Sequence, residues 1–386
     1  MSKTQRVALI VAMSFTYGRG VLRGICAYAK QGKPWVFNSA LPGSRAGRLL
    51  AEWEPAGVIG HLSVRSDAEA VVQLSRPAVN VSGVVEDVPV PRVGVDDIAI
   101  GKMAAEHFVE RGFRTFGFIG ERNTAYSDRR LSGFREKLQS HGADCEVFME
   151  RGGPIAAYNE RSWKSSDAAI THWLKSLSMP AAVFACNDVM AVRLSEGCRL
   201  AELRVPEDIA IAGVDDDELL CDMARPPLSS VRLPLEQVGF EAAKLLDGML
   251  NGKTPPAKSV LLPPSHVVTR QSSDILAVND PEVAKALRFI RGNAGEQIGV
   301  RDVLAACSVS RRVLERRFQK ALGRSPLDEI IRVRIERAKE ILAGTHLPMS
   351  AVAEASGFNG ASRLSVVFRN HTDMTPTQYR RRFRRS

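Results

Sequence analysis

The stretch RVALIVAM at residues 6–13 decides the fold class of most of this chain. It is short, apolar and rich in branched side chains, which is typical of a strand buried on both faces of a parallel sheet. A helical pattern follows at residues 19–31, and strand and helix patterns then alternate as far as residue 250. This alternation predicts an open parallel α/β sheet. The further strands are expected at residues 57–62, 78–82, 115–119, 145–149, 181–185 and 209–214, and the further helices at 66–75, 97–111, 128–141, 166–177, 188–202 and 235–250.

These strands are too many for one small sheet, so residues 1–271 are predicted to form an α/β domain of two lobes. Such proteins bind ligands in the cleft between the lobes, at the carboxyl ends of the strands. Residues 272–281 form a polar stretch that ends at a proline, and we expect a linker there. Residues 282–386 show only helical patterns with short turns, which predicts a second, all-α domain.

The positive charge of the chain is concentrated in this second domain. The 386 residues contain 53 Lys and Arg against 43 Asp and Glu. Residues 281–386 hold 18 Arg and 3 Lys against 10 acidic residues, so the first 280 residues are close to neutral. A basic segment beside a neutral one indicates that one part of the chain contacts a polyanion. Charge alone also fits a basic soluble domain, so the helix pattern must decide.

Cysteine spacing and hydropathy exclude several classes of protein. The six cysteines are scattered, and no pair has the spacing of a zinc site or a disulfide framework. We expect them to be buried thiols in a reducing compartment. No cleavage pattern follows the first apolar run, and no run approaches the length of a membrane span. The expected location is therefore the cytoplasm, without membrane contact.

The sequence carries no motif of a catalytic or cofactor site. The histidines have no nucleophile at a catalytic spacing, and neither a G-x-S-x-G motif nor a phosphate-binding loop is present. The glycines of Gly18-x-Gly20-x-x-x-Gly24 follow a strand but miss the dinucleotide-binding spacing. We expect them to allow tight turning and close helix packing. An enzyme acting on a sugar or nucleotide is therefore disfavoured, and no cofactor is expected.

Residues 301–323 have the pattern of a helix-turn-helix unit. A short helix at 301–306 precedes a turn, after which Ser310 is placed to cap a second helix that ends at Gly323. Arg312, Glu315 and Arg316 share the face of this helix opposite its apolar side. The second helix of such a unit enters the major groove, where Arg reads guanine and Glu accepts from the cytosine amine. These three residues are therefore predicted to bind DNA.

The same pattern recurs after a long helix at residues 327–343. A short helix at 350–355 and a turn lead into a second candidate recognition helix at 360–371. Ser362, Arg363 and Ser365 are predicted to face outward from it and to bind DNA. Two units joined by one stiff helix would reach successive major-groove segments about 34 Å apart on one face of the duplex.

Spaced motifs in this segment resemble the arabinose-operon activator (AraC) family. The matching residues are Arg334-x-x-x-Ala338-x-x-x-Leu342, Gly357-Phe358, Phe368-Arg369 and Thr375-Pro376-x-x-Tyr379-Arg380. The resemblance covers about 100 residues and implies that both recognition helices contact the bases of a double-stranded operator. Ala361 and Val366 stand where many members of that family carry polar residues.

The first 270 residues resemble the sugar-binding core of the lactose-repressor (LacI) family. The matching segments are Val95-Asp96-Asp97, Arg130-x-x-Gly133-Phe134, Cys186-Asn187-Asp188, Gly213-Val214-Asp215-Asp216 and residues 226–231. This core followed by an AraC-type tail resembles the family of xylose-operon regulators, which Tyr17-x-Arg19, Trp163, Glu218-Leu219 and Leu261-x-Pro263-Pro264 also echo. Gly18 departs from that family, which carries an acidic residue there, so the exact sugar stays open.

This resemblance implies a homodimeric transcription regulator that binds operator DNA and a monosaccharide effector, D-xylose or another sugar. It also implies activation of pentose-utilisation genes together with RNA polymerase, although a repressor remains an alternative. A periplasmic binding protein is disfavoured by the basic helical tail.

The chemistry of a polyol ligand selects the candidate binding residues. Sugars need carboxylates and amides that accept from hydroxyls, an Arg that donates two parallel bonds, and an aromatic surface for the ring. The predicted ligand-binding residues are Tyr17, Arg19, Asp96, Arg130, Trp163, Asn187, Asp188 and Asp215. Asp96 and Asp188 also begin helices, so capping is an alternative role for both. Trp163 has core packing as its alternative.

Overall fold

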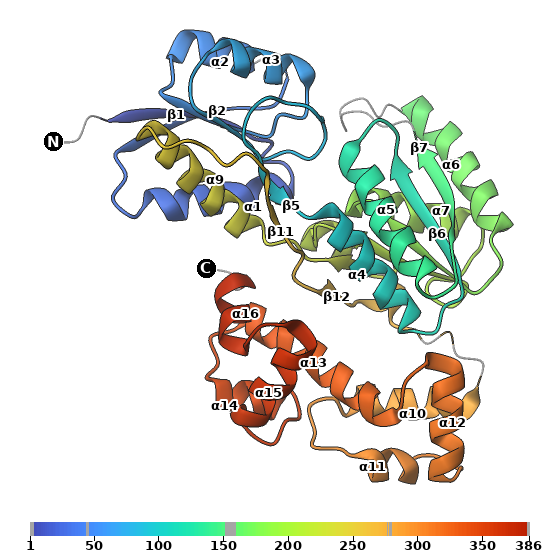
Figure 1. The fold of residues 1–386 in the computed structure, drawn as a ribbon. Coiled ribbons are helices and arrows are strands. Elements are labelled where there is room, and N and C mark those ends of the chain that lie inside the picture. The colour runs from blue at the N-terminus through green and yellow to red at the C-terminus, as the bar shows by residue number, and fades with distance from the viewer. Residues whose placement is uncertain (1–3, 44–45, 151–159, 276, 278–279, 384–386) are drawn as a thin grey trace.

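The computed structural model describes residues 4–43, 46–150, 160–275, 277 and 280–383, which form two α/β lobes and a helical domain (Figure 1). The first lobe is a parallel sheet in the order β2-β1-β3-β4. Alternate residues of β1 face opposite layers: Val7 and Leu9 pack with α1 and α9, whereas Ala8 and Ile10 pack with α2 and α3. The elements of this lobe are β1 (Gln5–Ile10), α1 (Thr16–Ala29), β2 (Trp35–Ala40), α2 (Ala46–Trp53), β3 (Gly57–Gly60), α3 (Arg65–Gln73), β4 (Ala78–Asn80) and α9 (Leu235–Leu250).

The second lobe is a sheet of six strands in the order β12-β10-β9-β8-β6-β7. Helices α4 and α5 cover one face of it, and α6 and α7 cover the other (Figure 1). All its strand pairs are parallel except β10 with β12, so the expectation of a purely parallel sheet is corrected at this edge. The elements are α4 (Asp97–Val109), β6 (Thr115–Glu121), α5 (Ala125–Gln139), β7 (Cys145–Glu150), α6 (Glu160–Ser176), β8 (Ala181–Ala185), α7 (Asp188–Leu200), β9 (Ile209–Val214), α8 (Glu218–Met223), β10 (Ser229–Val231) and β12 (Val267–Val268).

The chain crosses between the lobes three times, and the crossing segments form a hinge. The first crossing follows β5 (Val93–Val95), which pairs with β11 (Val260–Leu262) ahead of the third crossing. The amide of Asp96 donates to the carbonyl of Leu262 at 2.8 Å. The second and third crossings are joined where the amide of Arg232 donates to the carbonyl of His266 at 2.9 Å. Motion of one lobe therefore displaces three connected segments.

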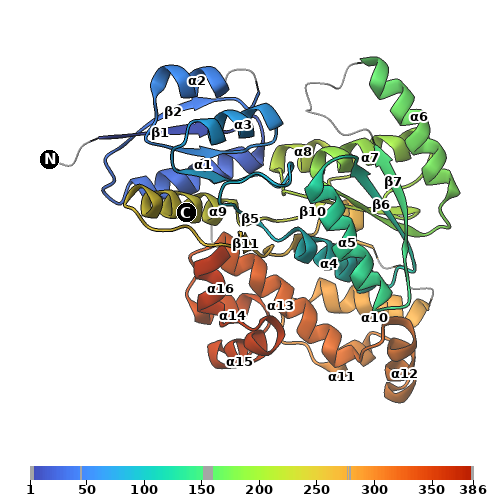
Figure 2. The same cartoon turned by 45° about the horizontal axis from the view of Figure 1, so that its top comes forward.

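The helical domain lies beneath both lobes and the hinge (Figure 2). It has two small cores, one built around Leu314 and Phe318 and the other around Leu364 and Phe368. Its helices are α10 (Pro281–Gly292), α11 (Val300–Ala305), α12 (Arg311–Leu322), α13 (Pro326–Gly344), α14 (Met349–Ala355), α15 (Ala361–Thr372) and α16 (Pro376–Phe383). Among the described residues, no helix is both long enough and apolar enough to cross a bilayer.

The glycines of α1 pack against α9, as the sequence predicts. A Cβ added at Gly24 would lie 1.8 Å from the carbonyl oxygen of Glu236, and one added at Gly239 would lie 1.9 Å from that of Val21. The two helix backbones therefore touch. The close contact fixes the first turn of α1, and with it Tyr17, relative to the hinge.

Candidate functional site

The predicted ligand residues of the two lobes lie near the lobe boundary, where a groove is lined by Arg19 and Asp215. From the first lobe, Tyr17 lies in the first turn of α1, and its hydroxyl donates to the carbonyl of Val81 at 2.9 Å. Its ring centroid is 5.5 Å from that of His61, whose pKa burial lowers to about 4. Burial raises the pKa of Tyr17, and charges of the second lobe at Arg130 and Asp215 act on the same hydroxyl. A neutral aromatic wall therefore faces charged groups across the lobe boundary.

Arg130 is the fixed cation of this cleft. Its side chain lies on α5, is only 4% exposed, and donates through Nε to Oδ1 of Asp97 at 3.1 Å. It also donates to the carbonyl of Cys186 and lies 4.7 Å above the ring of Tyr126. Burial works to lower the pKa of Arg130, but the carboxylates of Asp97 and Asp215 raise it. The guanidinium is thus charged and held in one orientation.

Asp215 is the carboxylate at the end of β9. Its backbone φ is 109°, a region that residues other than glycine seldom adopt, and Asp216 follows with φ 51°. Burial raises the pKa of Asp215 to about 7, against the lowering effect of Arg130. Within the described part of the chain, this carboxylate accepts no hydrogen bond. Strained backbone and a partly buried acceptor without a protein donor are features that cluster at ligand sites.

The structure gives several other predicted ligand residues a capping role. Asp96 accepts from the amide of Ala99 at 3.0 Å, and Asn187 accepts from the amide of Met190 at 2.8 Å. Asn187 also keeps its amide group in the cleft, where it donates to the hydroxyl of Tyr126 at 2.9 Å.

Asp188 is buried and lies behind the cleft rather than in it. It accepts from the hydroxyl of Ser230 at 2.6 Å and from the amide of Asp217 at 2.8 Å. Its contacts hold the loop that carries Asp215. Trp163 belongs to α6, but its side chain lies outside the described residues.

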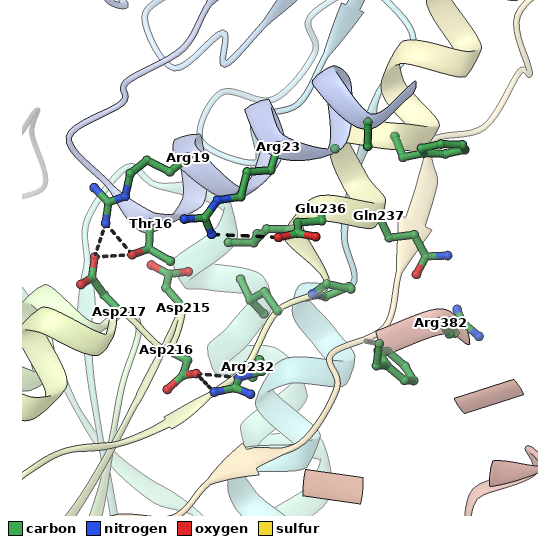
Figure 3. Close-up of a pocket in the computed structure, with 18 of the residues that line it drawn as sticks. Thr16, Arg19, Arg23, Asp215, Asp216, Asp217, Arg232, Glu236, Gln237 and Arg382 are labelled. Carbon is green, nitrogen blue, oxygen red and sulfur yellow. Dashed lines mark hydrogen bonds and ion pairs between the residues drawn. The ribbon is translucent and has the colours of Figure 1, made fainter. Parts of the chain in front are cut away.

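A groove of about 790 Å³ opens beside Asp215 (Figure 3). The hydroxyl of Thr16 donates to Asp217 at 2.7 Å, and Arg19 lies 3.6 Å from the same carboxylate. These contacts join α1 of the first lobe to the loop after β9 of the second. Arg382 of α16 lies at the far end of the groove, so the helical domain forms one of its walls.

Sequence reasoning missed two groups that shape the cleft. Asp97, rather than its neighbour Asp96, holds Arg130, and it also accepts from Arg129 at 3.0 Å. Tyr126 donates to Glu121 at 2.9 Å, and burial raises the pKa of that carboxyl. Asp97 belongs to the motif Val95-Asp96-Asp97. The sequence does not reveal which of the two adjacent carboxylates turns inward, because that depends on where α4 begins.

The two predicted recognition helices expose four of the six residues that the sequence predicts to face outward. Arg312 and Arg316 of α12 are exposed opposite its buried side, whereas Glu315 is partly covered and pairs with Arg311 at 2.9 Å. On α15, Ser362 and Arg363 are exposed and Ser365 is partly buried. The exposed face of α12 is therefore mainly basic, whereas that of α15 combines Ser362 and Arg363 with the apolar Val366.

The helical domain is anchored to the second lobe by ion pairs. Arg332 of α13 donates to Glu110 of α4 at 2.8 Å and to Glu329 of its own helix at 2.8 Å. Arg324 donates to Glu329 at 2.7 Å and to the carbonyl of Glu110 at 2.7 Å. Burial works to raise the pKa of Glu329, but Arg332 and Arg324 lower it to about 2. Glu329 is thus charged and fully paired at the contact.

A second contact of the helical domain is with the hinge itself. Tyr379 of α16 donates to the carbonyl of Ser265 at 2.9 Å, and Ser265 lies in the third crossing between the lobes. The ring of Tyr379 also packs edge-on against Phe368 of α15, with centroids 5.3 Å apart. One side chain therefore touches both a hinge segment and a candidate recognition helix.

Comparisons with known proteins place both parts of the chain. Residues 105–273 match the family model of a periplasmic binding protein-like domain, and residues 303–382 match that of a helix-turn-helix domain. The xylose operon regulatory protein of Escherichia coli (strain K12) is 28% identical over 98% of this chain and 97% of its own length. That of Haemophilus influenzae (strain ATCC 51907 / DSM 11121 / KW20 / Rd) is 31% identical over 75% of this chain and 74% of its own.

A solved structure of a xylose-binding transcription activator has the same arrangement of domains. Its TM-score to this chain is 0.64, with 27% identity and 100% coverage of both chains. The similarity therefore extends over the full length of both chains, from the periplasmic-binding-like sensor to the paired helix-turn-helix units.

Proposed function

This chain belongs to the family of xylose operon regulatory proteins, and from this premise we propose that D-xylose or a closely related pentose is its effector. It is a sugar-responsive, DNA-binding transcription regulator, as its relatives are. The observation that supports the choice of effector is the groove lined by Arg19 and Asp215, together with Tyr17 and Arg130, on whose pKa values the charge of Asp215 acts. An aromatic wall, a fixed donor and an unused carboxylate suit a ring that bears hydroxyl groups.

Ligand contact from both lobes supports closure as the response. A sugar bound between Tyr17 and Asp215 stabilises the arrangement in which the lobes are close, because only that arrangement supplies both contacts. We propose that Arg19, Asp96, Trp163, Asn187 and Asp188 contribute to the site as ligands or as supports.

A connected set of contacts supports transmission from the cleft to the DNA-binding helices. Asp216, the neighbour of Asp215, accepts from Arg232 at 2.6 Å and from Arg270 at 2.9 Å. The amide of Ser265 donates a hydrogen bond to the carbonyl of Arg232. The carbonyl of Ser265 in turn accepts from the hydroxyl of Tyr379, which belongs to α16. We propose that closure shifts this hinge segment and releases or reorients the helical domain.

We propose that α12 and α15 bind operator DNA through Arg312, Glu315, Arg316, Ser362, Arg363 and Ser365. We keep residues 1–271, 272–281 and 282–386 as the proposed sensor, linker and DNA-binding domain. Activation of pentose-utilisation genes with RNA polymerase in the cytoplasm is the proposed outcome, and a reporter gene behind the operator distinguishes it from repression.

A homodimer is proposed to form through α8. Leu219 and Met223 lie one helical turn apart and are 68% and 77% exposed. Two apolar side chains so exposed suit a self-complementary contact, and Leu219 also lines the groove beside Asp215. The test is sedimentation velocity, which measures how strongly Met223→Asp dimerises compared with the wild type. An unchanged dissociation constant of the dimer would contradict the assignment to α8.

The proposed effector is tested by thermal unfolding of the full chain with pentoses, hexoses and nucleosides. A ligand that prefers the folded state raises the melting temperature, and D-xylose at 100 times its Kd adds about 2.7 kcal/mol. Asp215→Asn should abolish the shift, whereas Asp144→Asn, at an exposed position on the second lobe, should retain it. A shift with another compound alone would contradict D-xylose, and an unchanged shift in Asp215→Asn would contradict the site.

A further inference from the structure

The two helix-turn-helix units repeat each other fifty positions apart. Leu314 and Leu364 are both buried, as are Phe318 and Phe368. Gly323 and Asp373 end their helices in the left-handed conformation, with φ of 70° and 56°. Ser325-Pro326 and Thr375-Pro376 then begin the next helices. This register makes α12 and α15 comparable residue by residue.

The outward faces of the two helices differ in chemistry. Arg312 of α12 corresponds to Ser362 of α15, and Arg316 corresponds to Val366. All four side chains are exposed, and they lie opposite the buried side of each helix. The first unit therefore offers two guanidinium groups where the second offers a hydroxyl and a branched alkyl group.

Val366 has no packing role that accounts for an apolar residue. Its side chain is 56% exposed, and it lies outside the core that Leu364 and Phe368 help to form. Arg363 and Arg369 are exposed on the same helix, so the surface around it is positive. A single exposed apolar residue is ordinary in itself, but this one lies at the centre of the face that corresponds to the arginine face of α12.

We propose that Val366 contacts the C5-methyl group of a thymine in the major groove, an inference that rests on the proposed role of α15 in DNA binding. Thymine alone presents a methyl group in that groove, and apolar side chains recognise it by contact. Arg316 at the equivalent position of α12 has the chemistry to read guanine. The two units thus recognise chemically different segments of one operator, and Val366 sets the choice in the second segment.

The test begins with selection of duplexes from a random library by the full-length protein. Each thymine of the selected duplex is then replaced by deoxyuridine, which removes only the methyl group, and Kd is measured for each duplex. At one thymine the loss should be about fourfold for the wild type, the value for one buried methyl group. Val366→Ala should bind the thymine and uracil duplexes equally, and Val72→Ala, an exposed valine of α3, should behave as the wild type.

Each outcome decides a separate point. If no sequence is selected, the proposed DNA-binding function of the chain fails. If a sequence is selected but Val366→Ala loses the same affinity as the wild type at every uracil, the assignment of Val366 is overturned. Correct folding of Val366→Ala is checked by an unchanged melting temperature, which is expected because alanine favours an exposed helix position.

Discussion

Asp215, a half-buried residue, combines three properties that rarely occur together. Its backbone lies at positive φ, its carboxylate accepts no hydrogen bond within the described residues, and its pKa is raised to about 7 by burial. Each property costs stability in the absence of ligand. Under the proposed effector role, the hydroxyl donors of a sugar would offset this cost.

The titration of Asp215 predicts how effector binding depends on pH. Hydroxyl donors favour the ionised carboxylate, so affinity should fall as pH decreases from 8 to 6, approaching tenfold per unit below the pKa. Because the folded pKa lies above the unfolded one, ionisation costs stability, and the ligand-free protein should lose stability as pH rises from about 4 to 7. Calorimetric titration with D-xylose measures the first effect.

Asp215→Asn should remove this pH dependence along with most of the affinity, and Asp144→Asn should leave it in place. Affinity that is constant between pH 6 and 8 in the wild type would contradict the role of Asp215.

At the scale of elements, pairs of helices in each lobe touch backbone to backbone, with no side chain between them, and these contacts fix the helices relative to each other. In the second lobe, a Cβ at Gly101 of α4 would lie 2.0 Å from the carbonyl oxygen of Arg130 in α5. In the first lobe, α1 and α9 touch in the same way at Gly24 and Gly239. Residues of the cleft stand on these helices, so their positions depend on glycines that contact no ligand.

Gly239→Ala should destabilise the sensor by about 1–3 kcal/mol, because its methyl group would overlap the carbonyl of Val21. Gly248→Ala in the same helix meets only the flexible side chain of Lys253, at 3.5 Å, and should stabilise the helix by up to about 1 kcal/mol. Denaturant unfolding of both variants measures the difference. Equal stability of the two would show that α1 and α9 can separate at little cost.

Periodicity predicted the long helices well and the short edge elements poorly. The range 235–250 was predicted for α9, and the structure has Leu235–Leu250. The sequence did not reveal β2, because an edge strand with exposed residues lacks the continuous apolar pattern of β1. It also missed α16, whose sequence PTQYRRRF is mostly polar. Helices that bury only two or three side chains leave too weak a pattern.

The candidate site was predictable where a motif follows a strand, and not where distant segments meet. Arg130 and Asp215 followed from the strand ends and the family resemblance, although their ligand roles stay predictions. The pairs of Arg332 with Glu110 and of Tyr379 with Ser265 join the two domains across more than a hundred residues. No local pattern encodes such pairs, because they depend on how the finished domains dock.

At the scale of the whole molecule, the docking of the helical domain on the hinge joins the two activities. Arg332 and Arg324 hold one end of the domain on Glu110 of the second lobe. Tyr379 holds the other end on a segment that crosses between the lobes, which we propose to move when the lobes close. The effector changes DNA binding only to the extent that these contacts differ between the open and closed arrangements.

Tyr379→Phe should weaken this coupling while leaving both domains folded. It removes the hydroxyl that donates to Ser265 and keeps the ring that packs on Phe368, so the loss should be about 0.5–1.5 kcal/mol. The measurement is the ratio of Kd for operator DNA with and without effector. Tyr28→Phe, which removes a hydroxyl bonded to Asp247 in the first lobe, is the control. A wild-type ratio in Tyr379→Phe would show that the hinge contact carries no coupling.

The fifty-residue repeat gives the recognised DNA a direction. If both proposed reading helices offered the same side chains, the two DNA segments that they contact could have the same base sequence. Here α12 offers arginines, whereas α15 offers Ser362 and Val366 at the corresponding positions. If the chain is reversed on the DNA, each segment therefore faces a helix of different chemistry. Under the proposed roles of α12 and α15, the two contacted segments differ in sequence, so the operator has a direction, and its orientation relative to a promoter becomes part of the regulatory signal.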